Sequence, residues 1–139
     1  MTRYLATLLF GFSAMALGAA ADISKVNGSI DVAAGREAGD AKTVNGSITI
    51  GSDARVRDVE TVNGDVFVGT GSRVDGGIRV EKPGARSWRK SERLPRITIE
   101  SGAEVNGTLR FEREVDLYVG AGAVIGPVEG VPPRRHELQ

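Results

Sequence analysis

The 139-residue chain has no cysteine, a single histidine and few aromatic residues. Without cysteine it can form neither a disulfide nor a lipid-modified N-terminal cysteine. Lysine and arginine together number 18, as do aspartate and glutamate, so no net positive field favours nucleic acid as a partner. A folded body made from this sequence must therefore be held by its apolar core and its backbone hydrogen bonds.

Long apolar runs are also absent beyond the first residues. Residues 1–21 combine the basic Arg3, an apolar run from Tyr4 to about Leu17 and small residues up to Ala21, which is typical of a secretory signal peptide. The run is too short for a comfortable transmembrane helix. We expect cleavage after Ala20 or Ala21, export to the periplasm, cell surface or medium, and no transmembrane helix in the mature chain.

No window shows the 3.6-residue apolar stripe of an amphipathic helix, whereas a six-residue period is clear between residues 44 and 80. Aliphatic residues recur there at Val44, Ile50, Val56, Val62, Val68, Val74 and Val80. VNGSITI (44–50) also returns eighteen residues later as VNGDVFV (62–68). Three sixes per repeat predict an all-β, single-stranded parallel β-helix, or β-solenoid, in which each coil has three short faces.

We expect about five triangular coils of about 18 residues in one domain spanning 22–130. Aliphatic pairs such as Ile48/Ile50 and Val66/Val68 should point inward, and the residue between them outward, which predicts an exposed Phe67. The hexads favour a left-handed coil, and the family resemblance described below favours a right-handed one, so the hand is left open.

Asparagine or aspartate followed by glycine recurs along the chain. Both residues tolerate left-handed backbone angles, and stacked amides can hydrogen-bond as a ladder. We therefore assign a structural role at the corners to Asn27, Gly28, Asn45, Gly46, Asn63, Gly64, Asp75, Gly76, Asn106 and Gly107.

The repeat is interrupted by a basic segment at 81–96, bracketed by Pro83 and Pro95. We expect it to be an insertion loop at a corner, because solenoids accommodate insertions there. An anionic surface or a polysaccharide is its candidate partner. The candidate binding residues are Lys82, Arg86, Trp88, Arg89, Lys90, Arg93 and Arg96.

The two ends differ in sequence. In the tail, 131–139, Pro132 and Pro133 are expected to end the ladder together with Pro127, because proline cannot donate a backbone hydrogen bond. No comparable cap precedes Val26, so the N-terminal coil is the predicted site of self-association.

Catalysis has little support in the sequence. Hexapeptide acyltransferases need a histidine base, and the only histidine here is His136 in the tail. The aspartate and glutamate residues near predicted corners lack the nonapeptide spacing of calcium-binding solenoids. We therefore predict no catalytic residue, no metal site and no cofactor.

Two bacterial families resemble this chain. VFVGTGSRVDG (66–76) and ITIESGAEVNG (97–107) resemble the bactofilin, or polymer-forming, family, and VNGSITI and VNGDVFV resemble putative-adhesin β-solenoid domains. The resemblance implies a parallel β-helix with a structural or surface role and no enzymatic activity.

The function expected from these features is that of a non-enzymatic exported envelope protein, acting as a scaffold or as an adhesin-like binding or self-association module. The alternative is a hexapeptide-repeat transferase or a polysaccharide-active solenoid enzyme. It is suggested by VGTGSR (68–73), IESGAE (99–104) and VGAGAV (119–124), which resemble the hexapeptide repeat of acyltransferases.

Overall fold

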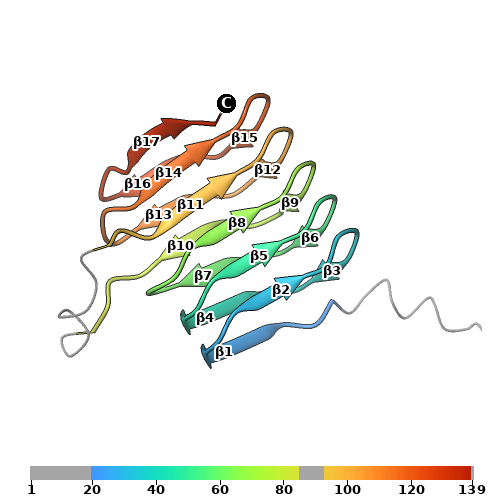
Figure 1. Ribbon diagram of the computed structural model, residues 1–139, viewed down its shortest axis with the longest axis horizontal. Helices are drawn as coiled ribbons and strands as arrows, with labels where there is room; N and C mark the ends of the chain where they lie inside the picture. The colour runs from blue at the N-terminus through green and yellow to red at the C-terminus, as the bar shows by residue number, and fades with distance from the viewer. Residues whose placement is uncertain (1–19, 85–92, 139) are drawn as a thin grey trace, which may run out of the picture.

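The computed structural model describes residues 20–84 and 93–138, and this part of the chain forms a parallel β-solenoid (Figure 1). The expected fold class is therefore confirmed. The predicted signal peptide, apart from its last two residues, lies outside the described residues. So do four of the predicted loop residues: Arg86, Trp88, Arg89 and Lys90.

Three parallel sheets form the three faces, and each of the first five coils contributes one strand to each sheet. Face 1 consists of β1 (Ile23–Asn27), β4 (Ala41–Asn45), β7 (Val59–Thr61), β10 (Ile78–Val80), β13 (Leu109–Phe111) and β16 (Val128–Gly130). Face 2 consists of β2 (Ile30–Val32), β5 (Ile48–Ile50), β8 (Val66–Val68), β11 (Arg96–Ile99), β14 (Asp116–Val119) and β17 (Arg134–Glu137). Face 3 consists of β3 (Glu37–Ala38), β6 (Arg55–Val56), β9 (Arg73–Val74), β12 (Glu104–Val105) and β15 (Val124–Ile125).

The described chain thus makes about six coils rather than the expected five, the sixth being represented by β16 and β17. The tail, which was expected to lie outside the solenoid, contributes β17. Arg135 of β17 pairs with Leu117 of β14. The prolines do not end the ladder, because Pro132 and Pro133 fall between β16 and β17. A proline disturbs a sheet only where its missing N–H is needed.

The core consists of columns of aliphatic side chains that run along the solenoid axis. Ile48, Ile50, Val66 and Val68 are completely buried, whereas Phe67 between the last two is 39% exposed. The inward pairs and the exposed aromatic were both predicted from the alternation of residues along a strand.

The prediction that an aliphatic residue points inward at every sixth position is wrong at the corner that follows face 1. Val44 is 38% exposed and Val62 is half-buried, while Thr43 and Thr61 are buried in their place. Strand alternation from Ala41 and Val59 decides which side chains point inward, so the residue two positions later enters the core even when it is a threonine.

The corner between faces 2 and 3 has one left-handed residue in each of the first five coils. Four of the five are glycines, and the exception is Asp53 with φ 57°. The full set is Gly35, Asp53, Gly71, Gly102 and Gly122. This position therefore accepts glycine without strain, and a side chain there carries a conformational cost.

Candidate functional site

Of the predicted basic loop, Lys82, Arg93 and Arg96 belong to the described residues. Lys82 is the second residue after β10, and its backbone N–H donates to Glu112 Oε1 at 3.4 Å. Arg93 and Arg96 belong to the returning stem that leads into β11. The stems therefore leave and rejoin the solenoid at the corner where the other coils pass from face 1 to face 2.

Asp65 anchors the returning stem. Arg93 Nη2 donates to both carboxylate oxygens, at 3.2 Å to Oδ1 and 3.1 Å to Oδ2. The backbone N–H of Arg96 donates to Oδ1 at 2.9 Å. A carboxylate that accepts three hydrogen bonds is held in one orientation, so Asp65 presents a fixed charged group beside β8.

The side chain of Arg96 continues a stacked series along face 2. Its guanidinium carbon lies 5.3 Å from the ring centroid of Tyr118. The ring of Tyr118 in turn stacks on His136, with centroids 4.4 Å apart and planes inclined by 15°. His136 Nε2 lies 3.0 Å from Asp116 Oδ1. The histidine expected in a tail is thus part of β17. Its ring contacts Tyr118 and its Nε2 contacts Asp116, both on the neighbouring strand β14.

Phe67 lies in a shallow groove on the outer surface of face 2. In register order, the outward row contains Asp31, Thr49, Phe67, Thr98, Tyr118 and His136. The groove has a volume of about 430 Å³ and is lined by Ser47, Ile48, Thr49, Asp65, Val66, Phe67, Arg96 and Thr98. We call it the face 2 groove. Sequence reasoning predicted the exposed ring but not the polar groups around it, because Asp65 and Arg96 lie 31 residues apart in the chain.

The Asn-Gly repeats form a true amide ladder over the first three coils. Asn45 Nδ2 donates to Asn27 Oδ1 at 3.0 Å, and Asn63 Nδ2 donates to Asn45 Oδ1 at 3.0 Å. The glycines after them are required by stacking, since a Cβ on Gly64 would meet the carbonyl group of Gly46.

Asp75, Gly76, Asn106 and Gly107 occupy a different corner, the one between faces 3 and 1. Gly107 N donates to Gly76 O at 2.6 Å, which stacks the two corners on each other. Asn106 is therefore no part of the amide ladder. The sequence pattern could not separate the two corners, because both need a residue pair that tolerates a sharp turn.

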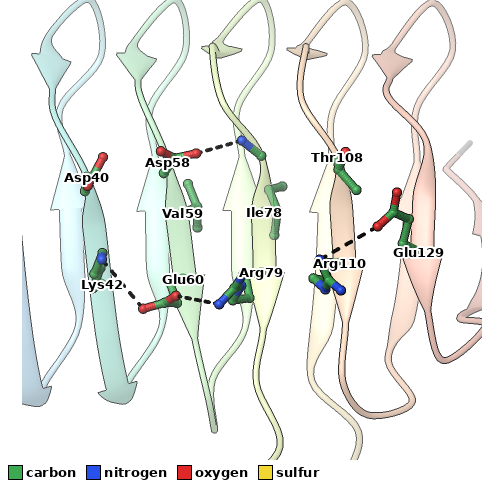
Figure 2. Close-up of a pocket in the computed structure, with 11 residues that line it drawn as sticks. Asp40, Lys42, Asp58, Val59, Glu60, Ile78, Arg79, Thr108, Arg110 and Glu129 are labelled. Atoms are coloured by element: carbon green, nitrogen blue, oxygen red, sulfur yellow. Dashed lines mark hydrogen bonds and ion pairs between the residues drawn. The ribbon is translucent and has the colours of Figure 1, made fainter.

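A second groove, of about 440 Å³, lies on the outer surface of face 1 (Figure 2). Its floor carries a row of charged side chains that neighbour one another in register: Lys42, Glu60, Arg79, Arg110 and Glu129. Their ion pairs are loose, at 3.9 Å for Lys42 and Glu60 and 3.8 Å for Arg110 and Glu129. Exposed pairs of this kind contribute little to stability.

Two carboxyl groups on face 1 differ in their electrostatic surroundings. The hydrogen bond from Arg57 Nε to Asp40 Oδ1, 2.7 Å long, lowers the pKa of Asp40. Glu81, just after β10, has a raised pKa because it is partly removed from water and lies near Glu60 and Glu112; Arg79 opposes this only in part.

Within residues 20–84 and 93–138, no three histidine, cysteine, aspartate or glutamate side chains are placed to hold a metal ion. The same residues include no helix long and apolar enough to span a membrane.

Comparison with known proteins finds no matching family model, no matching curated protein and no matching solved structure. The resemblance to bactofilins and putative adhesins therefore stays a prediction, and the function must be argued from the geometry of this chain.

Proposed function

We propose that this protein is a non-enzymatic, exported scaffold of the bacterial envelope that self-associates through its first coil. The observation that carries the proposal is the position of β1, β2 and β3. Within residues 20–84 and 93–138, each is the last strand of its sheet, so each has one edge without a neighbouring strand from this part of the chain. Unpaired backbone donors and acceptors favour the addition of another strand.

One exposed side chain of the first coil favours an apolar contact at this end. Ile30 and Val32 of β2 are 1% and 5% exposed, so they are already covered within the molecule and the apolar contact falls to β1. Val26 of β1 is 65% exposed, the highest value among the large exposed hydrophobic residues of the described chain. A second molecule placed against this end would cover both the strand edges and Val26.

The opposite end disfavours the same contact. In β17 the residues that pair with Leu117 and Val119 are Arg135 and Glu137, so charged side chains occupy the last positions of the aliphatic columns. Burial of these charges against the first coil and Val26 of another molecule would carry a desolvation cost. We therefore expect the N-terminal ends of two molecules to meet, which gives a closed pair rather than a filament.

The test is the molar mass of residues 22–139, which contain every described strand, by size-exclusion chromatography with light scattering. We expect a dimer that dissociates on dilution. Val26→Lys, which places a charge on the exposed contact, should give a monomer. Val131→Lys is the matched control, since Val131 is 39% exposed and follows the last face 1 strand, β16. A wild-type monomer at high concentration would refute the proposal.

The basic loop at 81–96 remains the candidate site for an anionic surface or polysaccharide. Arg93 and Arg96 are tied to the solenoid by Asp65, which gives the loop a fixed base. Its contribution is tested separately, by comparing binding of anionic vesicles to the wild type and to Lys90→Glu.

A further inference from the structure

We infer that the face 2 groove binds a pyranose ring of a polysaccharide, with Phe67 as the apolar surface and Asp65, Arg96 and the flanking threonines as hydrogen-bonding groups. A pyranose has a face of C–H bonds and a rim of hydroxyl groups. A site for it therefore combines one aromatic side chain with several fixed donors and acceptors. This inference does not depend on self-association, because the groove lies on the side of the solenoid and not at its N-terminal end.

The apolar part of the groove is the ring of Phe67, which has a threonine on each side. Thr49 and Thr98 are the register neighbours of Phe67 on β5 and β11, on either side of β8. Neighbouring strands lie about 4.8 Å apart, so both hydroxyls are within reach of a single sugar that contacts Phe67. Phe67 is 39% exposed and thus available for contact.

Asp65 and Arg96 lie beside this row and are held in place before any ligand binds. From the described part of the chain, Asp65 Oδ1 accepts hydrogen bonds from Arg93 and from the backbone of Arg96, whereas Oδ2 accepts one bond, from Arg93. A carboxylate oxygen has two acceptor positions, so Oδ2 can accept another bond from a sugar hydroxyl. The guanidinium of Arg96 is positioned over Tyr118 and supplies donors on the same side.

The composition of the groove favours a sugar over a protein partner. The core of a protein interface is depleted in charged residues and contains contiguous apolar side chains. Here the outward neighbours of Phe67 are threonines, with an aspartate and an arginine next to them. Sugars bind surfaces of this mixed kind because their own hydroxyls replace the lost water contacts.

The experiment measures co-sedimentation of residues 22–139 with chitin, cellulose and isolated peptidoglycan, three insoluble polymers of pyranose units. We expect retention on at least one of them, and about tenfold weaker retention of Phe67→Thr, which extends the threonine row without a change of backbone. Thr98→Val, which keeps the branched shape and removes the hydroxyl, should also weaken retention. Val124→Thr is the control, because Val124 is 55% exposed and lies in β15 on face 3, outside the groove lining.

Thermal unfolding of each variant verifies that the fold is kept. Wild-type protein that is retained by none of the three polymers would overturn the inference, as would equal retention of wild type and Phe67→Thr. If Phe67→Thr instead lowers the molar mass in solution and wild type shows no polysaccharide binding, Phe67 belongs to a protein contact and the inference is wrong. Retention that persists in monomeric Val26→Lys would show that sugar binding and self-association are separate.

Discussion

Arg113 Nη1 lies 3.1 Å from Asn63 Oδ1, although fifty residues separate the two along the chain. Asn63 ends the amide ladder, and in the next coil its corner is replaced by the segment at 81–96. The guanidinium therefore donates to the last amide of the ladder, and to the carbonyl of Val62 at 3.4 Å, from two coils away. Partial burial lowers the pKa of Arg113.

Replacement of Arg113 by methionine should lower the free energy of unfolding by about 1.5–3 kcal/mol, the usual contribution of a hydrogen bond to a charged group. Methionine keeps the unbranched, apolar part of the side chain, so packing is little changed. Chemical denaturation measures the effect. Asn63→Ala in both backgrounds completes a double-mutant cycle, and a coupling energy near zero would contradict the role of this pair.

Thr61→Val should stabilise the protein by about 1 kcal/mol, because the Thr61 hydroxyl is buried and has no hydrogen-bond partner among the residues that the structure describes. Valine has the same branched shape and removes the unsatisfied oxygen. Thr43 occupies the equivalent position one coil earlier, and its Oγ1 donates to Gly28 O at 3.0 Å. Thr43→Val should therefore destabilise, and equal effects of the two substitutions in denaturant melts would be inconsistent with this assignment.

Asp53→Gly should raise the free energy of unfolding by up to about 1 kcal/mol, because Asp53 has a left-handed backbone that glycine adopts without strain. The reverse exchange at the equivalent corner, Gly35→Asp, should lower it by a similar amount. Apart from Gly35 and its two chain neighbours, no heavy atom of the described residues lies within 4 Å of a Cβ built on Gly35, so the cost there is conformational and not steric. Changes of the same sign in both variants would argue against this explanation.

Glu81→Gln should stabilise the protein at pH 7. The raised pKa of Glu81 means that the folded state binds its proton more tightly than the unfolded state. Its contribution to stability is therefore present below the unfolded pKa and is lost as the pH rises through the folded value. The advantage of glutamine should shrink as the pH is lowered through this range, as thermal melts at several pH values would show.

Glu129→Gln serves as the control for that prediction. Glu129 faces Arg110 at 3.8 Å and its replacement removes an attractive contact, so no stabilisation at pH 7 is expected. A gain equal to that of Glu81→Gln would indicate a general effect of reduced negative charge.

Most of the fold could be predicted from the sequence because the inward pairs, such as Ile48/Ile50, report the two-residue alternation of a strand directly. The six-residue spacing failed at Val44 and Val62 because it averages over strands and corners. Corners are of unequal length, and Leu117 pairs with Ile97 twenty residues earlier, where Val66 pairs with Ile48 eighteen earlier.

The candidate site was harder to predict. An exposed Phe67 follows from alternation, but the grouping of Asp65 with Arg96 depends on which residues follow the segment at 81–96 when the coil resumes. The role of Arg113 was also out of reach, because a contact over two coils has no periodic signal in the sequence.

The segment at 81–96 affects how easily the sequence can change during evolution. Register partners on neighbouring face 2 strands are 18 residues apart for Ile48 and Val66. With the segment between them, Val66 and Ile97 are 31 residues apart. Closure of the longer loop costs only about 0.5 kcal/mol more, because the entropy of closure grows with the logarithm of loop length. Residues can therefore be added, removed or exchanged between the two stems at small thermodynamic cost, which leaves this corner free to acquire new binding properties while the coils on either side keep their sequence.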